Sequence, residues 1–204
     1  ARVEPVIRAI ASELSMPISI DTRKSAVAEA AVQVGARLVN DVSGFTYDPM
    51  LAGYCARNGL PVCVMHPLGE PETMQANPHY DDVLLDVYDF LERQVQTLEA
   101  AGLTRGQILV DPGIGFGKRV THNLALLRHV ALFHGLGCPV LVGASRKGFI
   151  GKITGARPAD ARMPGSVAVA QAMAAQGVQV VRGHDVAETA QALAMERAIS
   201  TGVY

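Results

Sequence analysis

Short runs of apolar, mostly β-branched residues alternate with longer segments of helical period along the chain, and this alternation limits the folds open to it. The short runs predict strands at residues 17–21, 38–42, 62–66, 108–111, 140–143 and 178–182. Their apolar stretches are nearly continuous, which is typical of parallel strands buried on both faces. About six βα units at regular spacing therefore predict an α/β fold, either a (β/α) barrel or an open doubly wound sheet.

Helical period predicts the segments that accompany these strands. The expected helices are residues 2–14, 23–34, 49–59, 121–134, 164–176 and 186–200, with a long amphipathic helix carrying Val83, Val87, Phe90, Leu91, Val95 and Leu98. Asp48 and Pro49 suit the N-cap and first turn of the third helix. A polar, proline-bearing loop at residues 67–79 interrupts the rhythm, and loops of that length are often functional lids.

The composition is typical of one packed domain, and the net charge does not indicate a highly charged partner. With 204 residues, 49% of them hydrophobic, we expect a single domain over residues 1–204. A net charge of -1 and a pI of about 6.7 argue against nucleic acid or a membrane surface as partner. Cys55, Cys63 and Cys138 form no CxxC pair and predict free thiols in a reducing compartment, the cytoplasm. No apolar stretch approaches the roughly 20 residues that would cross a bilayer, and no signal peptide opens the chain.

Polar residues end every predicted strand. In chain order they are Asp21, Asn40 with Asp41, Met65 with His66, Asp111, Ser145-Arg146-Lys147, and Arg182 with His184 and Asp185. Parallel strands of one barrel end on the same face, so these groups are expected to converge on one mouth. Charges and amides are costly to bury unless they meet a ligand or one another. Their convergence is the functional signal of the sequence.

Each of these residues also has a purely structural explanation. Asp21 and Asp185 would suit the caps of the helices that follow them, Asn40 would suit a turn, and Lys147 a solvated loop. All of these explanations would have to hold together, so a shared site is the better hypothesis. The histidines show no HExxH and no spacing with cysteine, which argues against zinc.

Two glycine-bearing or cationic segments suggest how an anionic, flat ligand would be held. Residues 111–118 lack the Walker A spacing and the dinucleotide glycine spacing, which leaves a loop whose backbone closely approaches a ligand. The cations Arg146, Lys147 and Arg182 lie at the last two strands, where barrels commonly bind phosphate.

Several motifs together resemble the dihydropteroate synthase family. They are residues 18–22 (ISIDT), 39–42 (VNDV), 64–66 with 73–75 (VMH and TMQ), 111–118 (DPGIGFGK), 143–151 (GASRKGFIG) and 182–186 (RGHDV). The resemblance implies a pterin-binding TIM barrel, (β/α)8, here with about six of its eight βα units because the first two strands have no counterpart. It implies an enzyme, a target of sulfonamides, that joins 6-hydroxymethyl-7,8-dihydropterin diphosphate to p-aminobenzoate in folate biosynthesis.

The resemblance also implies roles for individual residues. Hydrogen bonds to the pterin ring are expected from Asp21, Asn40, Asp111 and Lys147, and the apolar and backbone walls from Met65, Phe116 and Gly143. Arg182 and His184 are the expected diphosphate ligands, and Asp111 and Lys147 the expected catalytic residues. Gly148 stands where some members have Ser, so the contacts of p-aminobenzoate stay unassigned.

Cofactor and partners follow from the same resemblance. The family uses Mg²⁺ through an asparagine of the two strands without counterpart, so no metal ligand is expected in this chain. A homodimer with small-molecule substrates is expected. Two alternatives remain open: a methyltetrahydrofolate-binding methyltransferase domain, which would not need the cations Lys147, Arg182 and His184, and a non-catalytic homologue acting as a binding partner.

Overall fold

The computed structural model describes residues 2–68 and 78–203, which form six strands and the helices between them. The strands are β1 (Ile18–Asp21), β2 (Ala36–Asp41), β3 (Val62–Met65), β4 (Ile108–Asp111), β5 (Leu141–Val142) and β6 (Val180–Val181). The α-helices are α1 (Glu4–Glu13), α2 (Ser25–Gln33), α3 (Pro49–Arg57), α4 (Val83–Ala100), α5 (Val120–Arg128), α6 (Gly148–Thr154), α7 (Met163–Ala174) and α8 (Val186–Thr201). The 3-10 helices are η1 (Arg105–Gln107), η2 (Val130–Leu136) and η3 (Asp160–Arg162). Most of the predicted lid, residues 69–77, lies outside the described residues.

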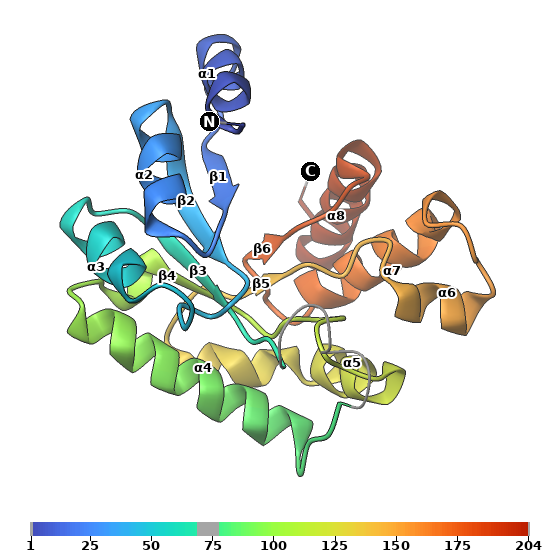
Figure 1. Cartoon of the computed structure of the whole chain (residues 1–204). Coiled ribbons are helices and arrows are strands. Elements are labelled where there is room, and N and C mark those ends of the chain that lie inside the picture. Colours follow the sequence, from blue (N-terminus) through green and yellow to red (C-terminus); the bar gives the residue numbers. More distant parts are fainter. Residues whose placement is uncertain (1, 69–77, 204) are drawn as a thin grey trace.

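The strands are parallel and stand in the order of the sequence. One sheet has the order β1-β2-β3-β4, a second pairs β5 with β6, and a parallel bridge between Val110 and Val140 joins the two. A doubly wound sheet would reverse its strand order at a switch point. The unbroken order is that of a barrel wall, with the helices packed around the strands (Figure 1).

The wall is open on one side. Among the described residues no strand pairing joins β1 to β6, which are therefore its two edges. Side chains from the carboxyl ends of the two edges still reach toward each other, with Arg182 Nη2 3.9 Å from Asp21 Oδ2. Residues from both edges of the sheet thus lie at the same mouth.

The register divides the strand residues between two faces. Ile20, Val39, Val62 and Ile108 are paired across β1 to β4, and all are buried. They face the covering helices, whose largest fully buried side chains include Leu51 and Leu91. The next residue along each strand points the opposite way, into the barrel, and that row begins with Asp21 and Asn40.

Capping residues confirm part of the predicted helix pattern. Asp48 is the N-cap of α3 and accepts from the backbone N–H of Met50 at 2.9 Å. Its other oxygen accepts from the backbone N–H and the hydroxyl of Ser25, both at 2.7 Å, and so ties α2 to α3. These hydrogen bonds, the Ser25 backbone N–H first, hold the pKa of Asp48 below its ordinary value.

Helix α6 and the strands β5 and β6 differ from expectation, and the helix predicted at residues 121–134 is divided into α5 and the 3-10 helix η2. The short helix α6 was not predicted, because Gly148 and Gly151 lie inside its seven residues and glycine disfavours a helix interior. Phe149 and Ile150 are buried, so α6 is held by packing rather than by propensity. The strands β5 and β6 are two residues each, shorter than predicted, since the Val140 N–H bonds to the side chain of Gln179 at 2.7 Å instead of extending a strand ladder.

Candidate active site at the carboxyl ends of the strands

Strand register brings the predicted pterin residues side by side. Asp21 is paired with Asn40 across β1 and β2, and Met65 is paired with Asp111 across β3 and β4. All four lie at the carboxyl ends of their strands, on the face that points into the barrel. Met65 is 2% exposed and lies deep in the mouth, whereas Asp21 is exposed at its rim.

Asp111 is the buried acid of this mouth. It is 7% exposed, and its Oδ1 accepts from the backbone N–H of Gly113 at 2.8 Å. Burial raises the pKa of Asp111, while the hydrogen bond from Gly113 and the charges of Lys147, Lys118 and Arg182 oppose that rise. A buried carboxylate surrounded by cations at a strand end is a typical functional arrangement.

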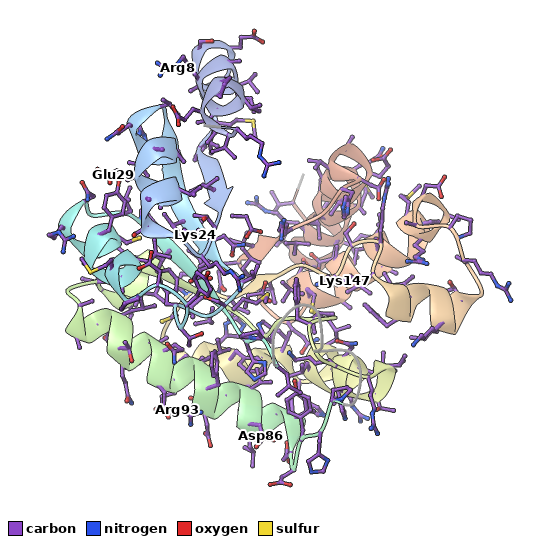
Figure 2. The ribbon with its side chains drawn as sticks, viewed as in Figure 1. Arg8, Lys24, Glu29, Asp86, Arg93 and Lys147 are labelled. Carbon is purple, nitrogen blue, oxygen red and sulfur yellow. The ribbon has the colours of Figure 1, made fainter. Side chains whose placement is uncertain are left out.

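Lys147 reaches from the loop after β5 to the glycine-rich loop after the neighbouring strand, β4. Its Nζ donates to the carbonyl of Ile114 and lies 4.4 Å from the centre of the Phe116 ring, a cation–π contact. The loop leaves room for it at Gly115, where an added Cβ would lie 2.8 Å from Lys147 Cδ. Burial lowers the pKa of Lys147 to about 8, with Asp111 opposing and Arg182 adding to the fall. Figure 2 shows Lys147 on the inner side of the wall, while Arg8, Glu29 and Arg93 lie on outer helices.

The predicted diphosphate residues line one cavity of about 230 Å³. Its lining consists of Gly143, Ser145, Lys147, Arg182, Gly183 and His184. The Ser145 hydroxyl accepts from the backbone N–H of His184 at 3.2 Å and lies 3.0 Å from His184 Nδ1. Because that hydroxyl can donate its own hydrogen to Nδ1, the Nε2–H of His184 is left to donate to a ligand. The cavity therefore presents an ammonium, a guanidinium and an imidazole N–H to an anion.

Neighbouring helices hold the loop after β5. Arg146 has a φ of 57°, and its guanidinium bonds to both carboxylate oxygens of Asp185, with Nε 3.0 Å from Oδ2. Its backbone N–H donates to Ser166 Oγ at 2.9 Å, and its carbonyl accepts from Arg162 at 2.8 Å. Left-handed backbone in a residue other than glycine persists only where surrounding contacts enforce it. The Arg146–Asp185 pair was not predicted, because the sequence does not show which charges meet.

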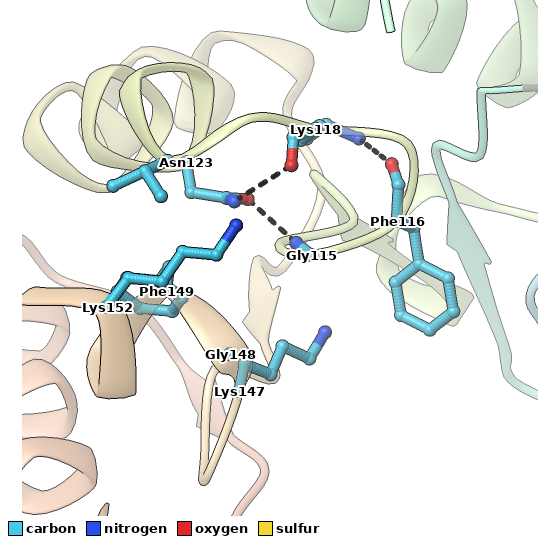
Figure 3. Close-up of a pocket in the computed structure, with 9 residues that line it drawn as sticks. Gly115, Phe116, Lys118, Asn123, Lys147, Gly148, Phe149 and Lys152 are labelled. Atoms are coloured by element: carbon cyan, nitrogen blue, oxygen red, sulfur yellow. Dashed lines mark hydrogen bonds between the residues drawn. The ribbon is translucent and has the colours of Figure 1, made fainter. Parts of the chain in front are cut away.

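A second cavity of about 290 Å³ is also lined by Lys147 (Figure 3). It is lined by Gly115, Phe116, Lys118, Val120, Asn123, Lys147, Gly148, Phe149 and Lys152. Asn123 borders it and accepts from the Gly115 N–H at 2.7 Å, which ties the glycine-rich loop to α5. The cavity combines aromatic walls with cations, and it shares Lys147 with the anion cavity.

Comparisons with known proteins agree with this geometry. A family model described as pterin binding enzyme matches residues 1–184. The dihydropteroate synthase of Escherichia coli (strain K12) is 43% identical over 192 residues, which are 94% of this chain and 67% of that protein.

Solved structures agree as well. The Yersinia pestis dihydropteroate synthase with a sulfonamide drug complex matches with a TM-score of 0.94 at 40% identity, over 98% of this chain and 73% of that one. The Thermus thermophilus enzyme in complex with 4-aminobenzoate matches with a TM-score of 0.90 at 43% identity, over 95% of this chain and 74% of that one.

This chain belongs to the dihydropteroate synthase family. It spans about two thirds of the length of curated synthases such as those of E. coli and Synechocystis. The predicted family and its TIM-barrel fold are confirmed, and the comparisons favour the synthase over the methyltransferase alternative.

Other residues singled out in the sequence have structural positions in the synthase. Asp41 is paired with Val64 on the helix-facing side of the sheet. It accepts from the Ser43 N–H at 2.7 Å and hydroxyl at 2.6 Å and from the Phe45 N–H at 3.1 Å, and Phe45 has a φ of 62°. Asp41 therefore stabilises a turn, although burial raises its pKa. Asp185, for which capping was the structural alternative, makes no side-chain cap hydrogen bond on α8, because its carboxylate bonds to Arg146.

Cys63 is a buried residue of the site that the sequence did not identify. It is paired with Asn40 and so faces the barrel interior beneath the mouth. Burial raises the pKa of its thiol well above the ordinary value, and the carboxylate of Asp111 adds to this. The register alone, which follows from the strand pattern, would have placed it there.

Residues 2–68 and 78–203 contain no group of three or more His, Cys, Asp or Glu side chains that would hold a metal ion. Mg²⁺ stays a prediction from the resemblance. Over the same ranges no helix has the length and apolarity to span a bilayer.

Proposed function

We propose that this chain carries the pterin and diphosphate sites of a dihydropteroate synthase, with Asp21, Asn40, Asp111 and Lys147 on the pterin ring and Arg182 and His184 on the diphosphate. The enzyme would join 6-hydroxymethyl-7,8-dihydropterin diphosphate to p-aminobenzoate, releasing diphosphate and 7,8-dihydropteroate. The observation that carries this proposal is the arrangement of a buried carboxylate, Asp111, with Lys147 and Arg182 close enough to act on its pKa.

The charges suit a reaction in which a diphosphate leaves. The bond between the pterin methylene carbon and the diphosphate oxygen breaks, and the electron pair departs with the diphosphate. Positive charge then develops on the methylene, where the Asp111 carboxylate stabilises it, while Lys147, Arg182 and His184 stabilise the anion. The aniline nitrogen forms the new bond to carbon and loses a proton. No protein nucleophile is needed.

The cavity beside Phe116 and Lys147 is the proposed site for p-aminobenzoate. Its aromatic walls, Phe116 and Phe149, suit a flat ring, and Lys152 suits the carboxylate. Lys147 lines both this cavity and the anion cavity, so an amine bound here would approach the carbon that the diphosphate leaves. A synthase similar to this chain, from Thermus thermophilus, has been solved with 4-aminobenzoate.

Two further proposals concern assembly and compartment. A homodimer is proposed from the family resemblance. A reducing compartment, the cytoplasm, is proposed because Cys55, Cys63 and Cys138 are free, buried thiols.

Turnover of Asp111→Asn tests the central step. The amide keeps the shape of the side chain but removes the charge, so we expect turnover to fall about 100-fold at saturating substrates. Thermal unfolding should change little. The measurement is the rate of 7,8-dihydropteroate formation, with circular dichroism for stability.

Asp41→Asn is the matched control, since Asp41 is also a buried acid at a strand end but faces the helices. It should destabilise the protein by about 1–3 kcal/mol through its turn and leave turnover near that of the wild type. Wild-type turnover in Asp111→Asn would remove Asp111 from the mechanism. Failure of the wild-type protein to bind pyrophosphate, measured by calorimetry, would favour methyl transfer instead.

A further inference from the structure

Lys118 is the last residue of the glycine-rich loop at residues 111–118. It is almost fully buried, yet the proposed reaction does not use it. It is 4% exposed. Its Nζ lies 3.0 Å from His66 Nδ1, 3.2 Å from the His66 carbonyl oxygen and 3.0 Å from the Phe116 carbonyl oxygen. An ammonium has three N–H donors, so these three acceptors use all of them. Burial lowers the pKa of Lys118 to about 7, while the charge of Asp111 opposes the fall, and the three acceptors suit the charged form.

The acceptor on the His66 ring requires a neutral imidazole. His66 is 5% exposed, and burial, with the charge of Lys118 adding to it, lowers its pKa to about 3. The ring is therefore uncharged near neutrality, with its proton on Nε2 and its Nδ1 free to accept from Lys118. The Phe90 ring packs edge-to-face against the His66 ring, with 4.9 Å between the ring centroids.

Lys118 joins the ends of two neighbouring strands. His66 follows β3 directly, and Phe116 lies in the loop after β4. The two segments are in close contact: a Cβ on Gly113, whose φ is 70°, would lie 2.1 Å from the His66 carbonyl oxygen. Tyr80 adds a second link, since its hydroxyl donates to the Gly117 carbonyl at 2.9 Å. The loop therefore has one defined path across the end of β3.

That path sets the surface presented to Lys147. The loop supplies the Ile114 carbonyl that accepts from Lys147 and the Phe116 ring beneath its ammonium. We infer that Lys118 is a positioning residue for the pterin site, holding the loop so that Phe116 and Ile114 orient Lys147 toward Asp111. This inference rests on the proposed function, because it names what holds that same site.

Calorimetric titration with 6-hydroxymethyl-7,8-dihydropterin diphosphate tests the inference on the whole protein, without p-aminobenzoate. Lys118→Met keeps the apolar stem and removes the three donors, so affinity should fall about tenfold or more. Arg105→Met is the matched control. Arg105 donates to the Leu136 carbonyl at 2.7 Å and precedes β4, at the opposite end of the barrel. This variant should lose stability while keeping wild-type affinity.

A second pair keeps the test decisive if Lys118→Met does not fold. His66→Phe keeps the ring and deletes the acceptor, and it should weaken pterin binding; His66→Asn, whose Oδ1 accepts in place of Nδ1, should not. Wild-type protein that binds no pterin diphosphate would overturn the proposed function itself. If the wild-type protein binds pterin diphosphate and Lys118→Met or His66→Phe binds it with the same affinity, only the role of Lys118 is overturned. The role of Lys118 is also overturned if Arg105→Met loses as much affinity as Lys118→Met.

Discussion

At the scale of single residues, the alternation of side chains along a strand decides which buried acid faces the ligand site. Asp41 and Asp111 both end buried strands, yet Asp41 points toward the helices and bonds to its own turn. Asp111 points into the barrel among cations. Side chains alternate along a strand, so a shift of one residue exchanges these roles. The sequence predicts Asn40 rather than Asp41 as the ligand only through the family resemblance, since composition treats the two neighbours alike.

His66 provides a prediction on stability and pH. Its pKa falls from 6.5 to about 3 in the folded protein, so between these values only the unfolded chain binds the proton. The free energy of unfolding should therefore decrease on acidification, by about 1.4 kcal/mol per pH unit below 6.5 from this group.

The comparison of wild type with His66→Asn isolates that contribution. Urea titrations at pH 7, 6, 5 and lower give the unfolding free energies of both proteins. As the pH falls, the wild type should steadily lose stability relative to His66→Asn. A constant difference across this range would show that His66 is protonated in the folded state.

At the scale of elements, the loop after β5 takes its shape from the helices that follow it. Arg146 links it to Asp185 at the start of α8, while Ser166 on α7 and Arg162 just before it bind the backbone of Arg146. Ser145 and Lys147 flank Arg146 and line the anion cavity. The anion site is thus assembled by tertiary contacts between α7, α8 and this loop.

Asp185→Ala should weaken diphosphate binding by about threefold to tenfold, because the loop loses its link to α8 and is less well positioned. Stability should fall only slightly, since the pair is partly exposed. Pyrophosphate titration with thermal unfolding measures both. Glu188→Ala, an exposed acid on the same helix, controls for the loss of a negative charge; an equal effect there would point to long-range charge instead of the Arg146 link.

Periodicity predicts the elements better than their connections. The six strands and most helices can be predicted because their buried faces repeat at regular intervals. Helix α6 was missed because packing of Phe149 and Ile150 outweighs its glycines. The Lys118–His66 contact joins residues 52 positions apart, so no local pattern indicates it. Pairings of this kind depend on which loops the closed fold brings together.

At the scale of the whole molecule, parallel strands in sequential order gather the functional groups at one mouth. Asp21 ends the first strand and Arg182 directly follows the last, yet Arg182 Nη2 lies 3.9 Å from Asp21 Oδ2. Between them the register sets Asn40 beside Asp21 and Asp111 beside Met65. The convergence predicted from polar strand ends is therefore a property of the barrel wall.

A crystal structure of the protein with 6-hydroxymethyl-7,8-dihydropterin diphosphate bound tests this convergence most directly. We expect the pterin ring within hydrogen-bond distance of Asn40, Asp111 and Lys147, with the diphosphate on Arg182 and His184. A ligand bound away from this mouth, or a pterin ring in the mouth without a contact to Asp111, would contradict it.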